Sequence, residues 1–201
     1  MVTGVILAAG QGLRMGAPKQ LLELGGKPMV CHVATAACHA AFDKVIVITG
    51  AYAADVTTAL EGFPLELVYN EEWAQGQSTS VKKAVKSISA ETQAVVFLLA
   101  DQPLIPTQLI NSLLQAYQDT NSSIIMPRAL HQPGNPVLFD LKSWRSALLQ
   151  LSGDEGARQI IRQHQTAVHY VELSEGQVFL DVDTPLEYSR MIKLWQELKK
   201  W

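Results

Sequence analysis

The chain has 201 residues, a formal net charge of −3 and 48% hydrophobic residues. This length is enough for one sizeable domain, and we expect a single domain over residues 1–201. The small negative charge argues against general attraction to nucleic acid or to an anionic membrane, so any anion site has to be local. No apolar run reaches the ~18 residues that span a bilayer, and no basic segment or cleavage pattern indicates a signal peptide.

The two cysteines, Cys31 and Cys38, indicate a reduced protein. They lie on one expected helix, where their spacing places them about 10 Å apart along the axis. This separation is too large for a disulfide. Because free cysteines are typical of reducing compartments, we expect a cytoplasmic protein.

Apolar β-type runs alternate with helical patterns as far as Pro127. This alternation predicts an α/β fold of the Rossmann-like, three-layer type with a mostly parallel sheet. The expected strands are Thr3–Leu7, Lys44–Ile48, Leu65–Tyr69, Ala94–Leu99 and Ile124–Pro127. The expected helices are Met29–Ala41, Ala53–Leu60, Ser78–Ser87 and Thr107–Tyr117.

Beyond Pro127 the pattern is less regular. Further strands are expected over Val137–Phe139, Ala167–Leu173 and Gln177–Leu180. Further helices are expected over about Leu141–Leu149, Glu155–His164 and Pro185–Leu198. The last helix has proline in its first turn, and its apolar positions predict that it docks on the sheet.

The first strand runs directly into a glycine-rich loop that carries two cations. Small side chains allow backbone N–H groups to approach a polyanion, and Arg14 and Lys19 add fixed positive charge. Such a loop suits a nucleoside triphosphate, although an ordinary glycine-rich turn with surface charges stays open as the alternative. The candidate nucleotide-binding residues here are Leu7, Ala8, Ala9, Gly10, Gly12, Arg14 and Lys19.

Two better-known phosphate loops do not fit this segment. A P-loop needs Ser or Thr after its lysine, whereas Gln20 follows Lys19. A dinucleotide fingerprint needs G-x-G-x-x-G and an acid about 20 residues later. The spacing of Gly10, Gly12 and Gly16 is one residue too long, and residues 29–38 contain no acid. The sequence therefore disfavours a hydride-transferring enzyme.

Two acidic segments are candidate metal sites. Asp101 follows the strand Ala94–Leu99, and ligands in open α/β sheets bind beyond the carboxyl ends of strands. Asp181 and Asp183 point to one side if their segment is extended, and carboxylates so placed suit a hard cation. The alternatives are structural: Asp101 forms a turn or a helix cap, and Asp183 or Thr184 caps the last helix.

Three further segments could contact substrates. Gly76 precedes a run of hydroxyl residues, which is either a ligand-binding helix start or only a good cap; this run is Ser78, Thr79 and Ser80. A loop with two prolines and a glycine is conformationally fixed, and it contains Pro133, Gly134 and Asn135. Arg158 follows the turn Gly153-Asp154. Either Arg158 binds a phosphate, or the turn serves only to let Asp154 cap a helix.

Taken in order, these segments resemble the nucleotidyltransferases that activate phosphosugars and molybdopterin, in particular the molybdopterin cytidylyltransferases. The resemblance spans residue 4 to about residue 190. It is carried by residues 7–19, the Asp-x-Pro at 101–103, the Gly-x-x-Thr-Ser-Val at 76–81 and the Asp-x-Asp-Thr-Pro at 181–185. Asn135 departs from the histidine that is common in the family's Pro-Gly-x-Pro loop.

The resemblance implies a role for each segment. Arg14, Lys19 and Asp101 would be catalytic, and Asp101, Asp181 and Asp183 would hold Mg²⁺ or Mn²⁺. The loop after the first strand would bind the nucleotide. The hydroxyl segment would also bind it, through Gly76, Ser78, Thr79 and Ser80. The acceptor would contact Pro133, Gly134, Asn135 and Arg158.

The implied reaction is transfer of CMP from CTP to a molybdopterin-type cofactor, with release of pyrophosphate. The double alanine Ala8-Ala9 resembles the cytidylyl branch, because the guanylyl branch usually has a second glycine there. A molybdenum hydroxylase apoenzyme is a further candidate partner. The alternatives are transfer of GMP or another nucleotide to the same cofactor or to a sugar phosphate, and a non-catalytic chaperone that carries the cofactor.

Overall fold

The computed structural model describes residues 1–13 and 15–198 of the chain. Its central sheet contains β1 Val2–Ala8, β4 Lys44–Thr49, β5 Glu66–Tyr69, β6 Ala94–Leu99, β7 Ile124–Ala129, β8 Gln132–Pro133, β9 Val137–Asp140 and β10 Val168–Leu173. The strand order is β10-β7-β9-β6-β1-β4-β5, and β8 pairs with β7. A separate small hairpin consists of β2 Glu23–Leu24 and β3 Lys27–Pro28.

The first strand occupies the middle of the sheet. β1 pairs in parallel with β4 and β6, so Val5 lies beside both Ile46 and Phe97. Continuous apolar runs are typical of parallel strands that are buried on both faces, and the expected mostly parallel sheet is confirmed. β9 differs, because it runs antiparallel to both β6 and β7.

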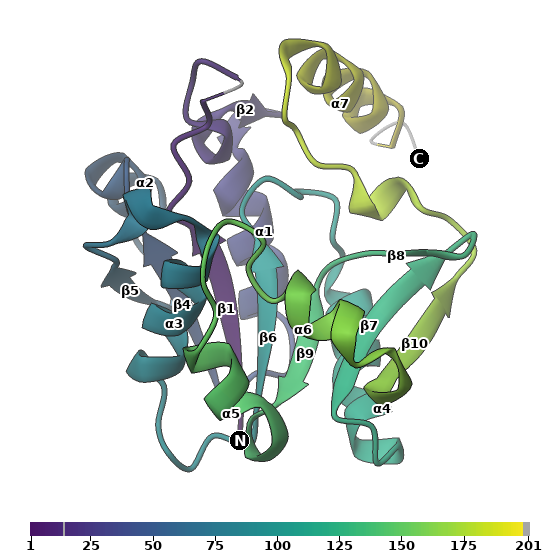
Figure 1. The fold of residues 1–201 in the computed structure, drawn as a ribbon. Coiled ribbons are helices and arrows are strands. Elements are labelled where there is room, and N and C mark those ends of the chain that lie inside the picture. The colour runs from purple at the N-terminus through teal and green to yellow at the C-terminus, as the bar shows by residue number, and fades with distance from the viewer. Residues whose placement is uncertain (14, 199–201) are drawn as a thin grey trace.

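Helices cover both faces of the sheet, which confirms the three layers (Figure 1). One face packs against α1 Met29–Cys38, α2 Ala53–Ala59 and α4 Thr107–Asp119. The other face packs against α3 Gln77–Ser87, α5 Leu141–Leu149 and α6 Arg158–Gln163. The amphipathic helices bury their apolar sides against the strands, which leaves the strand ends to form a binding edge.

The last helix, α7 Pro185–Leu198, packs against the β2–β3 hairpin instead of the sheet (Figure 1). Its Met191 joins Leu24, Met29 and Val182 in a separate apolar cluster. The expectation that this helix docks on the sheet is therefore wrong. The physical reason is that the hairpin and the start of α1 supply an apolar surface of their own.

Two other expectations need correction. The segment Gln177–Leu180 is not a strand, because Gln177–Phe179 forms a 3₁₀ turn whose apolar side chains Val178 and Phe179 pack onto the core. The helix expected from Glu155 begins only at Arg158. Gly156 has φ +55, a left-handed conformation that a continuing helix cannot contain.

Cys31 and Cys38 are free cysteines, as expected. Within residues 1–13 and 15–198, none of the helices has the length and apolar character needed to cross a membrane.

Candidate active site

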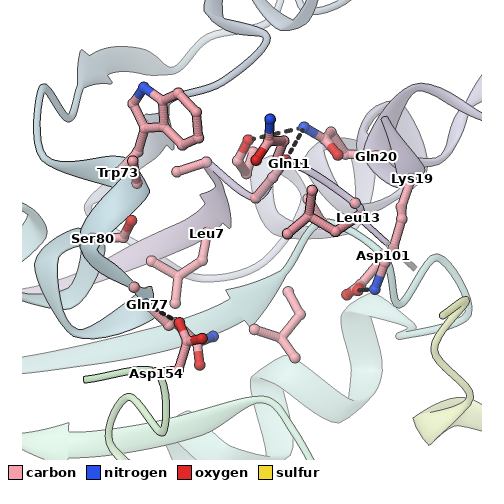
Figure 2. Close-up of a pocket in the computed structure, with 18 of the residues that line it drawn as sticks. Leu7, Gln11, Leu13, Lys19, Gln20, Trp73, Gln77, Ser80, Asp101 and Asp154 are labelled. Carbon is pink, nitrogen blue, oxygen red and sulfur yellow. Dashed lines mark hydrogen bonds and ion pairs between the residues drawn. The ribbon is translucent and has the colours of Figure 1, made fainter. Parts of the chain in front are cut away.

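A cleft of about 440 Å³ lies beyond the carboxyl ends of β1 and β6 (Figure 2). It is bordered by the glycine-rich loop on one side and by the start of α3 on the other. The sequence-predicted residues that line it are Leu7, Ala8, Ala9, Gly10, Gly12, Lys19, Gly76, Ser80, Asp101 and Asp183. Segments that are far apart in the chain thus meet at the edge where an open α/β sheet binds ligands.

The glycine-rich loop is held in shape by a buried glutamine that the sequence analysis missed. Gln20 is 4% exposed, and its Nε2 donates to the carbonyl oxygens of Ala8 at 3.3 Å and Gly10 at 3.1 Å. A Cβ at Gly12 would lie 2.3 Å from the carbonyl oxygen of Ala17, and its φ is +67, so this position requires glycine. Arg14, the other predicted cation of the loop, lies outside the described residues.

Lys19 joins the two acidic segments. Its ammonium nitrogen lies 3.6 Å from Oδ2 of Asp101 and also forms a close ion pair with Oδ1 of Asp183. Burial raises the pKa of the Asp101 carboxyl above its ordinary value; Lys19 acts against this shift, and Asp181 and Asp183 add to it. Burial, followed by the charge of Asp183, also raises the pKa of Asp181, although Asp181 does not line the cleft.

Neither Asp101 nor Asp183 is the side chain that caps the helix after it. α4 begins after Pro106 with no side-chain cap, so Asp101 does not cap it. α7 is capped by a reciprocal pair: the N–H of Glu187 donates to Oγ1 of Thr184 at 3.3 Å, and that hydroxyl donates to Oε2 of Glu187 at 2.9 Å. The cap is therefore Thr184, and the Asp183 carboxylate is left to face Lys19.

The carboxylates at this end of the cleft could hold a divalent cation only with further ligands. Within the described part of the chain, no three His, Cys, Asp or Glu side chains are close enough to hold an ion alone. Mg²⁺, however, is usually held by one or two carboxylates together with substrate phosphates. Asp101 and Asp183 already share one cationic group, so the pair fits a hard cation that arrives with a triphosphate.

The start of α3 is capped from a distant loop. The N–H of Gln77 donates to Oδ1 of Asp154 at 3.2 Å, and the N–H of Ser78 donates to the carbonyl oxygen of Gly153 at 3.2 Å. Asp154 is thus a cap, but of α3 and not of the helix that follows it. Because these N–H groups already have protein acceptors, the helix terminus offers less to an anion than the sequence suggested.

The three hydroxyl residues of this segment have different surroundings. All three are buried, and of the three Ser80 lines the cleft. Oγ1 of Thr79 donates to the carbonyl oxygen of Gly76 at 2.8 Å. Buried Asn70 donates from Nδ2 to the hydroxyls of Thr79 at 2.9 Å and Ser80 at 3.1 Å. Ser80 is therefore placed to contact a ligand, and the Thr79 hydroxyl holds the turn.

Trp73, Asp154 and Gln11 also line the cleft, but the sequence analysis assigned none of them to it. Figure 2 shows Trp73 on the side of the cleft above Ser80. A Cβ at Gly50 would lie 2.7 Å from Cβ of Trp73 and 2.8 Å from Cβ of Ala9. Gly50 thus allows Trp73 to approach the loop. The sequence signal that could have indicated this part of the site is that Gly50 directly follows the buried strand β4.

The expected acceptor residues lie partly in a second, smaller cavity of about 40 Å³. Asn135 and Arg158 line this cavity, which shares Leu7, Gln77 and Leu99 with the main cleft. Pro133 is exposed on β8. Gly134 packs against the ring of Phe179, since a Cβ there would lie 2.5 Å from the ring. The two cavities are therefore neighbours.

Comparison with protein families gives a match over residues 4–170 to the MobA-like NTP transferase domain. The chain belongs to this family. It is a nucleotidyltransferase, and its single α/β fold is that of its structural neighbours. The assignment agrees with a cleft that combines a small-residue loop, a lysine and carboxylates at strand ends.

Relatives of this MobA-like protein span almost its whole length. The nicotine blue oxidoreductase of Paenarthrobacter nicotinovorans is 30% identical over 198 residues, which cover 95% of this chain and 96% of that protein. A homologue of Rv0371c from Mycobacterium sp. strain JC1 is 30% identical, with a TM-score of 0.86 and 98% of each chain covered. Rv0371c of Mycobacterium tuberculosis, in a complex with manganese, is 26% identical, with a TM-score of 0.82 over 96% of this chain and 98% of that chain.

Proposed function

We propose that this protein is a cytidylyltransferase that uses a divalent metal to transfer CMP from CTP to a molybdopterin-type cofactor. The observation that carries the proposal is the cleft itself, where the Ala8-Ala9-Gly10 loop faces Lys19, Asp101 and Asp183. A loop of small residues suits a triphosphate, and the carboxylate pair suits the metal that accompanies it. The manganese complex of Rv0371c supports a divalent metal.

In this reaction, a phosphate oxygen of the acceptor forms a bond to the α-phosphorus of CTP. The bond from that phosphorus to the bridging oxygen breaks, and pyrophosphate leaves with the electron pair. The attacking oxygen is already anionic, so no strong general base is needed, and catalysis rests on positioning and charge neutralisation. A cation held by Asp101 and Asp183 would supply Lewis-acid stabilisation of the phosphate charge.

Each chain residue then has a defined task. Lys19, which pairs with the two carboxylates, would exchange them for phosphate oxygens as the substrate enters. Gln20 holds the carbonyl groups of Ala8 and Gly10, so the loop is pre-shaped before the triphosphate arrives. Arg14 would add a second cation to the pyrophosphate.

The base and the acceptor would occupy opposite parts of the site. The cytosine would lie between Ala9 and the Trp73–Ser80 side of the cleft, because the phosphates occupy the Lys19 end. The acceptor would enter through the neighbouring cavity, where Arg158 offers a cation and Asn135 an amide. The α-phosphorus would then lie where the two cavities meet, near Leu7 and Leu99.

A thermal-shift panel tests the nucleotide assignment. CTP, GTP, ATP and UTP would each be added with Mg²⁺ or Mn²⁺, and a ligand that binds only the folded state raises the melting temperature by mass action. The largest shift is expected with CTP and metal together. A larger shift with GTP would assign the protein to guanylyl transfer instead.

The relative named nicotine blue oxidoreductase supports a second candidate, reduction of an organic substrate, although the glycine spacing of this chain does not match a dinucleotide fingerprint. Its match covers nearly the full length of both chains. The test is to incubate the protein with NADH or NADPH and the substrate that the relative's name states, and to follow loss of the reduced-cofactor absorbance. Substrate-dependent oxidation that survives in Asp101→Asn would favour this candidate over nucleotidyl transfer.

A further inference from the structure

Gln102 is a buried polar residue directly behind the cleft, next to Asp101. Its side chain is 3% exposed, and it lines neither the main cleft nor the second cavity. Its backbone N–H donates to the carbonyl oxygen of Leu99 at 3.2 Å, within the tight turn that ends β6. No role in nucleotide transfer follows from its position alone, because it does not reach the cleft.

The side chain of Gln102 connects the two acidic segments of the site. Its Nε2 donates to the backbone carbonyl oxygen of Phe179 at 3.0 Å, a bond between residues 77 positions apart in the chain. Phe179 comes two residues before Asp181 and four before Asp183. This hydrogen bond therefore joins the turn that carries Asp101 to the segment that carries the other carboxylates.

The same segment is fixed at a second point. Val182, between the two aspartates, is fully buried in the cluster that contains Leu24 and Met191. The ring of Phe179 packs against Gly134 in the predicted acceptor loop. Among residues 1–13 and 15–198, the other contacts that tie the segment before Val182 to the core are apolar, and apolar packing does not fix the direction of a chain as a hydrogen bond does.

The other polar atom of the amide is not satisfied. Within residues 1–13 and 15–198, Oε1 of Gln102 is buried and has no hydrogen-bond partner. A buried acceptor without a donor destabilises the folded state, and an apolar side chain of the same size would avoid this cost. Global stability is thus a poor explanation for a glutamine here, whereas the Nε2 donor has a specific partner.

We propose that Gln102 is a positioning residue that holds the Asp181–Asp183 segment against Asp101, so that the carboxylates of the two segments converge on one cation. It acts through the Phe179 carbonyl and touches neither metal nor nucleotide. This inference rests on the proposed metal site, but the bond and its effect on the segment are measurable without any metal. Residues that orient metal ligands typically alter metal affinity about 10- to 100-fold when they are replaced.

The test uses Gln102→Met, which keeps the size and loses the donor, and Gln102→Asn, which keeps an amide but shortens its reach. Gln108→Met is the matched control, because Gln108 is exposed on α4. Three quantities are measured: the affinity for Mn²⁺ with and without CTP, amide hydrogen exchange over residues 177–183, and the melting temperature. If Gln102→Met does not fold, Gln102→Asn carries the test.

The expected result is a Mn²⁺ affinity at least about 10-fold weaker and faster exchange confined to residues 177–183, in both variants. The melting temperature of Gln102→Met should change little, because removal of the unsatisfied acceptor offsets the loss of the hydrogen bond to the Phe179 carbonyl oxygen. The control should change none of the three. Unchanged exchange over residues 177–183 in a folded variant would overturn the proposal, as would faster exchange throughout the protein. A parent that binds no Mn²⁺ even in the presence of CTP would instead refute the proposed metal site, and local exchange would then decide the role of Gln102.

Discussion

The ammonium nitrogen of Lys19 lies 3.6 Å from Oδ2 of Asp101, at the end of the cleft where the glycine-rich loop meets the end of β6. Both side chains are about four-fifths buried: the exposed fraction is 18% for Lys19 and 24% for Asp101. A lysine and a carboxylate held this close in a cleft form a site that neutralises charge of either sign. The proposed reaction needs both functions, because triphosphate and divalent cation enter together.

Replacing Lys19 by methionine should separate these two functions. Affinity for CTP with metal should fall by about 1.5–3 kcal/mol, the usual contribution of a hydrogen bond to a charged group. Affinity for Mn²⁺ in the absence of nucleotide should rise, because the carboxylates lose their internal cation. Isothermal titration of Lys19→Met measures both. Lys193→Met, an exposed change on α7, is the control, and parent-like affinity for both ligands would place the phosphates elsewhere.

Gly50→Ala should disturb the side of the cleft assigned to the base. The added Cβ would lie 2.7 Å from both the carbonyl oxygen of Ala9 and Cβ of Trp73, so the loop and the tryptophan have to separate. We expect the free energy of unfolding to fall by about 1–3 kcal/mol and CTP affinity to fall with it. Gly176→Ala is a matched control, since its Cβ would lie 3.6 Å from Cβ of Ala129, an ordinary van der Waals contact. Full CTP affinity in a folded Gly50→Ala protein would argue against a base site here.

Asp140 should contribute stability that depends on pH. Burial raises the pKa of its carboxyl, but hydrogen bonds from Ser143 and Tyr117 outweigh this and set the pKa below its ordinary value. A lowered folded-state pKa means that the stabilisation is complete above the unfolded value, near pH ~4, and is lost as the pH falls through the folded value.

Asp140→Ala should therefore destabilise the protein by about 1–3 kcal/mol at neutral pH, through loss of the α5 cap and of the Tyr117 bond. The difference from the parent should shrink in strong acid. Urea unfolding at neutral pH and at roughly pH 3 measures this change. A difference that is equal at both pH values would show that the charge of Asp140 has no part in it.

Much of the fold was predictable because the signals are local. The apolar runs of β1, β4 and β6 and the alternation with helices identified a three-layer α/β domain. The antiparallel course of β9 was not predictable, since strand direction depends on distant pairing. The β2–β3 hairpin was missed although Gly25-Gly26 lies between its strands, and Gln177–Phe179 was misassigned because short apolar runs do not distinguish a strand from a packed turn.

The site was predictable where its chemistry lies in motifs. Lys19, Asp101 and Asp183 follow recognisable patterns and the structure brings them together. Gln20 and Trp73 carry no such pattern, and the sequence indicates Asp154 only as a cap. Their importance arises from tertiary contacts, such as the cap that Asp154 supplies to a helix that begins 77 residues earlier, and a single sequence does not encode such contacts locally.

Asp101→Asn should nearly abolish turnover with little change in stability. Asparagine keeps the size and one acceptor oxygen but loses the charge that offsets a divalent cation. α4 has no side-chain cap, so no structural contribution of Asp101 to that helix is lost. Asp55→Asn, an exposed change of equal charge on α2, should keep full activity. Comparison of initial rates and melting temperatures of the three proteins measures both effects.

The most direct test of the central claim is to quantify products when the protein is given molybdopterin-type cofactor, metal and each of the four nucleoside triphosphates in turn. We predict that CTP yields pyrophosphate and cytidylylated cofactor in equal amounts, faster than any other nucleotide, and that Asp101→Asn yields neither. Faster transfer from GTP, or equal product formation by Asp101→Asn, would contradict the account.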